Sequence, residues 1–182
     1  MRRIAVLSVL LLGIDQATKT VAQLAFPETS TAAWRACREA GLDCADVVFA
    51  PGWGLVYIEH AGFWVWSAAP PLVVYGAHLL VLVVWLGVLA AGLWYRRWYR
   101  VSLAVDLSVA FFTVAAWGNL LDRLLVGGAR DWLVTPVAVA NLADVAVWPA
   151  LALLTVEVWR FPPARGLLRA GLSFDPRKIR RP

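Results

Sequence analysis

The chain has 182 residues, of which 61% are hydrophobic and only 16% are charged, and it contains 11 Trp. A composition this apolar excludes an ordinary soluble domain of this length and indicates a membrane protein with several spans. The formal net charge is +5, but the basic residues flank the apolar runs and are not interleaved with aromatic residues. We interpret them as topology signals and contacts to anionic membrane lipids, and we expect no nucleic-acid partner.

Four apolar segments are long enough to cross a hydrocarbon core of about 30 Å as helices. They cover roughly residues 4–26, 70–95, 101–121 and 141–159. The first run resembles a secretory signal, but Asp15 and Lys19 interrupt it and no convincing cleavage site follows, so we interpret it as an uncleaved span. The predicted fold class is an all-α membrane protein with four transmembrane helices, and residues 1–182 are predicted to form a single integral membrane domain.

The distribution of Lys and Arg predicts the orientation. Twelve of the 17 Lys and Arg residues lie before the first span, between the second and third spans, or after the fourth. The positive-inside rule makes that side the cytoplasm, so both termini and the basic tail of about 160–182 are expected inside. The loops around 27–69 and 122–140 are then expected outside.

The outer segment 27–69 is more than a connector. "STAAWRACREAGLD" has helical spacing, whereas "GWGLVYIEHAGFWVW" is rich in aromatic and β-branched residues and indicates a strand with bends. A small extracytoplasmic β element is therefore predicted beside the helices. Cys37 and Cys44 lie in the same segment and could pair in an oxidising compartment, but their short spacing fixes no geometry, so both redox states remain open.

The pattern Asn-x-x-Asp occurs twice, at the facing ends of the last two spans: Asn119 to Asp122 and Asn141 to Asp144. About 21 helical residues of 1.5 Å rise place Asp122 near the outer boundary, and Asp144 lies about one turn below the start of its span. An Asp beside Arg123 at a helix end is ordinarily an interfacial ion pair, but two such motifs at one depth favour a functional pair. Within each motif, the amide is expected to orient its own carboxylate.

Two carboxylates within a few ångströms cannot easily both ionise, so one holds a proton while the other stays charged. Together they can activate a water and protonate a leaving amine, which is the chemistry of an aspartic peptidase. His60, His78 and the two cysteines show no zinc-ligand spacing, and we expect neither a metal nor another cofactor.

Asp15 and Lys19 are spaced i, i+4 and share one face of the first span. A buried pair of this kind is expected to face the helix bundle. It is either a structural ion pair that fixes helix packing or a contact below the acid pair, and both interpretations remain open.

Several segments resemble those of bacterial lipoprotein signal peptidase (signal peptidase II), a four-span aspartic peptidase of the cytoplasmic membrane. The segments are "DQATK" (15–19), "GNLLDR" (118–123), "GARDW" (128–132) and "NLADV" (141–145), in the family's order and on the expected spans. The resemblance implies that Asp122 and Asp144 form the catalytic dyad and that the outer sheet cradles the substrate. It also implies a set of residues that bind substrate or shape the site: Asp15, Lys19, Asn119, Arg123 and Asn141.

The resemblance further implies the substrate and its place in the cell. The family cleaves prolipoproteins whose cysteine carries a diacylglyceryl group, just before that cysteine, near the outer face of the inner membrane. Members usually carry an Asn-x-Gly-x-Ala-Phe stretch on the outer sheet, whereas this chain has His60 in place of the Asn and keeps Gly62. We include His60 and Gly62 in the predicted substrate site.

The predicted function is therefore a membrane aspartic endopeptidase that processes lipid-modified precursors. One alternative is a non-catalytic or substrate-specialised lipopeptide-binding paralogue, which the change at His60 motivates. A more remote alternative is a small ion-coupled transporter, which would distribute its carboxylates through the membrane depth. The expected partners are the precursor and membrane lipids, and nothing in the sequence requires more than a monomer.

Overall fold

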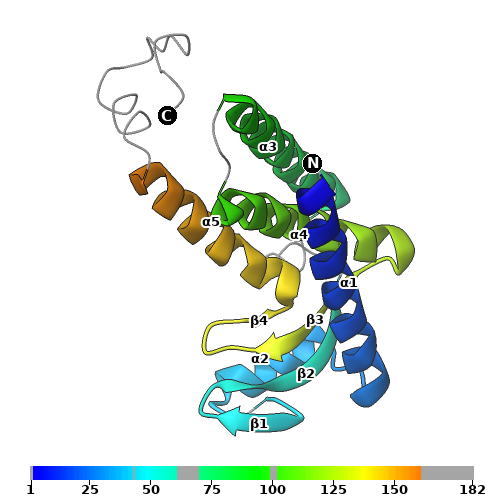
Figure 1. Cartoon of the computed structure of the whole chain (residues 1–182). Helices are drawn as coiled ribbons and strands as arrows, with labels where there is room; N and C mark the ends of the chain where they lie inside the picture. The colour runs from blue at the N-terminus through cyan, green and yellow to red at the C-terminus, as the bar shows by residue number, and fades with distance from the viewer. Residues whose placement is uncertain (1, 43, 61–69, 99–101, 161–182) are drawn as a thin grey trace.

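The computed structural model describes residues 2–42, 44–60, 70–98 and 102–160. Its framework is four long helices, each long and apolar enough to cross a membrane (Figure 1). They are α1 (Arg2–Ala25), α3 (Pro71–Trp98), α4 (Leu103–Leu125) and α5 (Leu142–Arg160). These helices correspond to the four predicted spans, and with the small sheet described below they confirm the predicted fold class.

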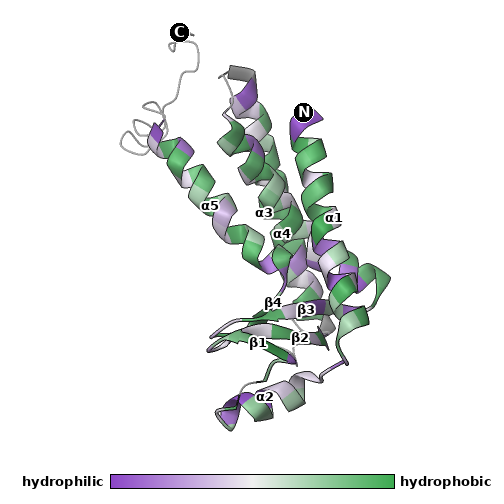
Figure 2. Ribbon diagram, turned by 60° about the horizontal axis from the view of Figure 1, so that its bottom comes forward, coloured by the Kyte–Doolittle hydropathy of each residue, from purple (hydrophilic) through white to green (hydrophobic). Residues whose placement is uncertain are grey.

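The helices consist mostly of apolar residues, as their colouring in Figure 2 shows. Large hydrophobic side chains such as Leu72, Val9 and Trp148 are among the most exposed in the molecule. A surface of this kind suits contact with lipid chains rather than with water. Most of the burial falls on α4, which contacts α1, α3 and α5 and is the most enclosed of the four helices. The helix that carries Asn119 and Asp122 is therefore the centre of the bundle.

Small residues allow α1, α4 and α5 to approach closely at one end of the bundle. A Cβ atom added at Gly118 would lie 2.5 Å from the Cβ of Ala143 and 2.8 Å from Oδ2 of Asp15. Distances this short leave no room for a side chain, so glycine is required there. Close backbone approach at small residues is a common device of membrane helix packing. Here it brings the polar residues of three helices together.

A four-stranded antiparallel sheet lies across this end, which we call the sheet end (Figures 1 and 2). Its strands are β1 (Val47–Ala50), β2 (Trp53–His60), β3 (Ala129–Val134) and β4 (Val139–Ala140), in that spatial order. In the described part of segment 27–69, the predicted β element supplies β1 and β2. The other two strands come from the loop between α4 and α5, because the edge of β2 pairs with β3 from Gly54 to His60.

The register of β2 and β3 fixes which side chains share a face of the sheet. Ile58 pairs with Asp131 and His60 pairs with Ala129. Because side chains alternate along a strand, His60 and Asp131 are diagonal neighbours on one face, whereas Arg130 points to the other. The pairing thus joins a residue of the first outer segment to a residue of the second.

The predicted surface helix is present as α2 (Thr31–Glu39). Ser30 caps its first turn, Trp34 packs against the apolar cluster of Val56, Ile58 and Val134, and Arg38 donates to the backbone oxygen of Pro136 at 2.6 Å. A disulfide joins Cys37 at the end of α2 to Cys44 before β1. The redox state that the sequence left open is therefore oxidised in the structure.

We expect both cysteines to resist alkylation in membranes prepared without reductant. They are the chain's two cysteines, so mass spectrometry after alkylation should find no label before reduction and two labels after it. The closed loop is short, and the chain-entropy model assigns such a cross-link about 2–3 kcal/mol. Labelling of either cysteine without reductant would contradict the disulfide.

The opposite end of the bundle holds a separate set of polar contacts. Asp106 of α4 is buried and forms ion pairs with Arg3 of α1 and Arg96 of α3. Glu157 of α5 accepts hydrogen bonds from Ser102 at 2.7 Å and Tyr95 at 3.3 Å. Both acids have partners that tie neighbouring helices together, and neither lies near the sheet.

Candidate active site

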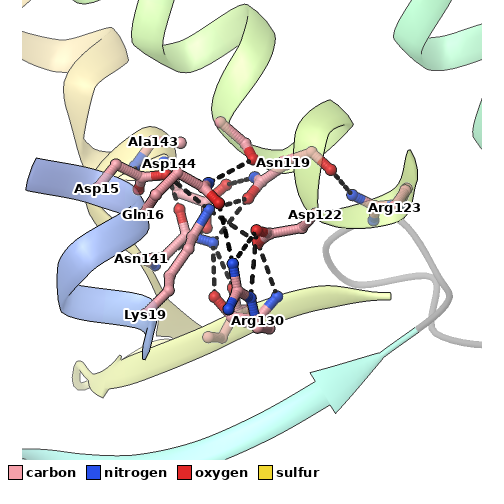
Figure 3. Close-up of polar contacts among 12 residues, drawn as sticks. Asp15, Gln16, Lys19, Asn119, Asp122, Arg123, Arg130, Asn141, Ala143 and Asp144 are labelled. Atoms are coloured by element: carbon pink, nitrogen blue, oxygen red, sulfur yellow. Dashed lines mark hydrogen bonds and ion pairs between the residues drawn. The ribbon is translucent and has the colours of Figure 1, made fainter. Parts of the chain in front are cut away.

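The polar residues of the sheet end converge where α1, α4 and α5 meet β3 (Figure 3). Most of the side chains that the sequence predicted for the site lie in this one cluster: Asp15, Lys19, Asn119, Asp122, Asn141 and Asp144. Arg123 lies at its edge, and its Nη1 donates to the backbone oxygen of Asn119 at 3.2 Å. His60 joins the cluster through Asp131. Gly62 lies outside the described residues.

Asp122 is enclosed by cations. Its Oδ2 lies 2.9 Å from Nζ of Lys19 and accepts the backbone N–H of Arg130 at 3.1 Å, while its Oδ1 accepts Nη2 and Nε of Arg130 at 2.8 and 3.2 Å. The Asp122 side chain has no exposed surface. A carboxylate held by two cations and a backbone donor is stabilised in its ionised form, and it offers no free oxygen to a substrate.

Lys19 also forms an ion pair with Asp15, the acid on its own helix. Its Nζ lies 2.9 Å from Oδ2 of Asp15 and donates to Oδ1 of Asn119 at 3.1 Å. Oδ1 of Asp15 accepts the backbone N–H of Ala143 at 2.9 Å, in the first turn of α5. A carboxylate at a helix N-terminus satisfies an otherwise free N–H and favours the helix dipole. Of the two interpretations left open, these contacts favour helix packing.

Asp144 has a different environment. Its Oδ1 accepts Nδ2 of Asn119 at 2.8 Å, and its Oδ2 accepts the backbone N–H of Asn141 at 3.1 Å. Oδ1 of Asn141 accepts the backbone N–H of Asp144 in return, at 3.1 Å. This reciprocal pair is a capping box that starts α5. As a whole residue Asp144 is partly buried, whereas Asp122 is fully buried.

The two Asn-x-x-Asp motifs therefore work differently. In the second motif, Asn141 orients its own carboxylate, as predicted. In the first motif, the amide of Asn119 turns away from Asp122 and donates to Asp144 on the neighbouring helix. The expectation that each amide orients its own carboxylate is thus wrong for Asn119, because the ion pairs already occupy Asp122.

A third carboxylate, Asp131 of β3, lies beside Asp144. Its Oδ1 accepts Nδ2 of Asn141 at 2.6 Å, and its Oδ2 lies 3.0 Å from Nε2 of His60. Asn141 thus contacts both acids, with its side-chain amide on Asp131 and its backbone N–H on Asp144. The carboxylate next to Asp144 is therefore Asp131 rather than Asp122.

Sequence reasoning assigned no role to Asp131 or Arg130, although both belong to the "GARDW" segment. Helical rise gave Asp122 and Asp144 a depth, but it gives none to a residue in a loop. A usable signal was the adjacent pair of opposite charges in an otherwise apolar segment. In the structure the side chains of these two neighbours have different partners. Arg130 hydrogen-bonds Asp122, whereas Asp131 hydrogen-bonds His60 and Asn141.

The imidazole of His60 is affected by burial and by charge. Burial by itself lowers its pKa, but the hydrogen bond to Asp131 and the negative charge of Asp131 outweigh burial and raise the pKa of His60 above its usual value. Arg123 lowers it and Asp144 raises it by smaller amounts. His60 therefore favours the protonated form at pH values where an ordinary histidine is neutral.

Across the described part of the chain, no group of three or more His, Cys, Asp or Glu side chains is arranged to hold a metal ion. The arrangement that is present comprises two neighbouring carboxylates, Asp131 and Asp144, held by asparagine amides beside a fully buried ion-pair cluster. Such a pair can exchange protons with a water and a substrate.

Comparison with known proteins finds a family model and solved structures that match this chain. A family model described as "Signal peptidase (SPase) II" matches residues 7–160. Two solved structures, each described as a bacterial membrane enzyme, share the fold. The first has a TM-score of 0.52 at 16% identity and covers 96% of this chain and 94% of its own. The second has a TM-score of 0.55 at 16% identity, with coverage of 87% and 93%.

Among curated proteins, no significant match is found. At 16% identity, the two solved structures establish the fold alone. The family model carries the assignment, because residues 7–160 include most of the chain and all four motif segments. The chain belongs to the signal peptidase II family.

Proposed function

We propose that this chain is an aspartic endopeptidase that cleaves diacylglyceryl-modified prolipoproteins just before the lipidated cysteine. Family membership makes it a peptidase that removes the signal peptides of lipoproteins, and its four apolar helices make it a multi-pass membrane protein. The aspartic mechanism and the lipid requirement are the finer parts of the proposal. The observation that supports an aspartic mechanism is that Asn141 hydrogen-bonds two neighbouring carboxylates, Asp131 and Asp144.

The acid pair that we propose is Asp131 with Asp144. The sequence predicted Asp122 as the partner of Asp144. Three contrasts support the revision. Lys19 and Arg130 occupy Asp122, its side chain has no exposed surface whereas that of Asp131 retains 9%, and Asn141 joins Asp144 to Asp131.

The proposed reaction needs one ionised and one protonated carboxyl group. The ionised group takes a proton from water as the water oxygen attacks the carbonyl carbon of the scissile bond. The protonated group gives its proton to the carbonyl oxygen, which forms a neutral tetrahedral diol. As the C–N bond breaks, the first group gives the proton that it took from water to the leaving nitrogen, and the second group takes a proton back from a hydroxyl of the diol. The products are a carboxylic acid and an amine, and the pair returns to its starting state.

In this proposal Asp122 positions the sheet. Its bonds to Arg130 tie β3 to α4, and Arg130 also donates to Gln16 of α1 at 2.9 Å. Because Arg130 precedes Asp131 in the strand, these contacts restrict where the carboxylate of Asp131 can lie. Removal of Asp122 should therefore affect cleavage through the fold rather than through proton transfer.

The proposed location is the bacterial inner membrane, with both termini in the cytoplasm and the sheet end at the outer face. The position of 12 of the 17 Lys and Arg residues supports this orientation. Asp131 and Asp144 would then lie near the outer interface, where acyl chains can stay in the bilayer while the peptide bond reaches the acids. Membrane lipids and the precursor are the proposed partners of a monomer.

A cleavage assay in liposomes tests the function. The purified chain should cut a diacylglyceryl-modified precursor before the modified cysteine, and it should cut the same precursor without the lipid at least tenfold more slowly. Mass spectrometry of the products locates the cut. Binding of the lipidated precursor without any cleavage would instead identify a lipopeptide-binding paralogue, and equal cleavage of both precursors would refute the lipid requirement.

A further inference from the structure

His60 is placed against the proposed acid pair by the pairing of β2 with β3. It is the last residue of β2 and pairs with Ala129, so it shares a face with Asp131 two residues further along β3. Its Nε2 lies 3.0 Å from Oδ2 of Asp131, and 11% of its side chain is exposed. The imidazole therefore touches an acid of the pair rather than open solvent.

The bonding of His60 restricts its hydrogen positions. A carboxylate oxygen is an acceptor, so Nε2 must carry the hydrogen of the contact to Asp131. The other ring nitrogen, Nδ1, is buried and finds no hydrogen-bond partner among the residues that the structure describes. Within the described ranges, the contact with Asp131 is consequently the polar bond through which this ring acts on the site.

Charged groups from three other elements act on the ring: Asp131 of β3, Asp144 of α5 and Arg123 of α4. Two of them are acids, and the nearer acid accepts the hydrogen bond. Attraction to Asp131 outweighs the cost of burial, so the pKa of His60 is raised. The ring thus brings a positive charge to one acid of the pair.

The other acid has no such partner in its hydrogen bonds. Among the residues that the structure describes, the groups that donate to Asp144 are the side-chain amide of Asn119 and the backbone N–H of Asn141, and both are neutral. Lys19 acts on Asp144 through its charge but without a hydrogen bond that the structure records. A cation stabilises an adjacent carboxylate more than a neutral donor does. The hydrogen bonds of the two acids are therefore unequal, because His60 bonds Asp131 and neutral groups bond Asp144.

We propose that His60 is a positioning residue that assigns the two roles within the acid pair. As an imidazolium it donates Nε2–H to Oδ2 of Asp131 and keeps Asp131 ionised, so the shared proton resides on Asp144. Asp131 then activates the water and Asp144 protonates the substrate. This inference rests on the proposed function, and it concerns a residue at which the chain departs from the usual asparagine of the similar family.

The first test is the pH profile of cleavage for His60→Asn. Asparagine keeps a neutral N–H donor but removes the charge. The acid side of the kcat/KM profile reports ionisation of the water-activating carboxyl group, and a nearby cation lowers that midpoint by about 1–3 pH units. We therefore expect His60→Asn to move the acid-side midpoint upward by about one unit or more. It should also abolish the fall in rate that accompanies loss of the imidazolium at higher pH.

His78→Asn is the matched control. His78 of α3 is the chain's other histidine, is also buried, and bonds through Nδ1 to the backbone oxygen of Val74. This change should leave the midpoints of the profile where they are. If His60→Asn instead lowers the rate equally at every pH, without a shift of the midpoints, the assignment of roles is wrong and His60 has only a packing function.

A second measurement needs no activity. Because the chain has two histidines, a histidine-labelled sample gives two imidazole titrations by NMR, and His78→Asn identifies the signal of His60. Asp131→Asn should lower the titration midpoint of His60 by about one unit or more, while the midpoint of His78 stays unchanged. An unchanged His60 midpoint would overturn the inference even if His60→Asn proved inactive.

The two measurements separate this inference from the proposed function. A chain that shows the His60 to Asp131 coupling by NMR but never cleaves the lipidated precursor refutes the peptidase mechanism alone. A chain that cleaves the precursor, but in which His60 titrates independently of Asp131, refutes the role of His60 alone.

Discussion

Asp131→Asn and Asp144→Asn are each expected to lower kcat/KM for the lipidated precursor by about 10²- to 10⁴-fold, the range that a general acid or base contributes. Asparagine nearly preserves the shape of the carboxyl group, so the loss should come from proton transfer. Asp131 accepts from Asn141 and His60, and Asp144 from Asn119 and Asn141. Each substitution leaves one oxygen to accept a hydrogen bond, and the unfolding midpoint in detergent should fall only modestly.

The matched control is Asp46→Asn, which changes an exposed aspartate that precedes β1. It should leave both the rate and the unfolding midpoint unaltered. A different result would contradict Asp131 as the partner of Asp144. If Asp131→Asn cleaves at the wild-type rate while a folded Asp122→Asn variant does not cleave, then the pair is Asp122 with Asp144, as the sequence alone predicted.

The helical part of the structure could be predicted because the membrane imposes simple lengths. Apolar runs of about 20 residues must be helices to satisfy their backbone groups in lipid. The same helical rise placed Asn119, Asp122, Asn141 and Asp144 at one depth, and the structure brings them together. The depth of these residues therefore followed from counting along two spans.

The partners of those residues could not be predicted by the same reasoning, because they depend on contacts between loops. Arg130 and Asp131 follow α4 in a loop, and their positions are set by the pairing of β3 with β2. That pairing joins segments about 70 residues apart, and a shift by one residue would exchange the faces of Arg130 and Asp131. Helical depth predicted that Asp122 lies near Asp144. The ion pairs of Asp122 with Lys19 and Arg130 depend on tertiary contacts, which helical depth does not predict.

The repeated Asn-x-x-Asp motif illustrates the limit of local reasoning. At Asn141 the motif starts a helix, where backbone N–H groups are free, and it forms a capping box. At Asn119 the motif lies inside the last turns of α4, where most N–H groups are already bonded within the helix. The amide of Asn119 is therefore free to reach Asp144. The same Asn-x-x-Asp spacing therefore gives two hydrogen-bond patterns, because backbone N–H groups are free at the start of α5 but mostly bonded in the last turns of α4.

Asp122→Asn is expected to be the most destabilising of the conservative substitutions at the sheet end. Removing one partner from a buried ion pair costs about 3–5 kcal/mol, because the remaining charge stays buried. Lys19 has no exposed side-chain surface, and Arg130 has 7%. In the variant, Lys19 keeps its ion pair with Asp15, and Arg130 keeps its hydrogen bond to Gln16. The cost should therefore fall near the lower end of that range, read as a lowered unfolding midpoint in detergent.

Asp106→Asn provides the matched comparison at the far end of the bundle. Asp106 is nearly as deeply buried as Asp122 and also pairs with two cations, but the side chains of its partners, Arg3 and Arg96, are 61% and 26% exposed. They can turn to solvent when the acid is removed, and exposed pairs are worth only about 0–1 kcal/mol. Asp106→Asn should therefore lower the unfolding midpoint less than Asp122→Asn does.

A double-mutant cycle isolates the interaction of Asp122 with Lys19. Lys19→Met should itself be destabilising, because it leaves Asp15 and Asp122 without that cation. Combined with Asp122→Asn, the loss should be smaller than the sum of the single losses by about 0.5–3 kcal/mol, the range for residues in direct contact. Strict additivity would mean that the 2.9 Å contact between Lys19 and Asp122 contributes nothing to stability. In that case Asp122 would no longer be explained as a structural carboxylate, and its role in proton transfer would have to be reconsidered.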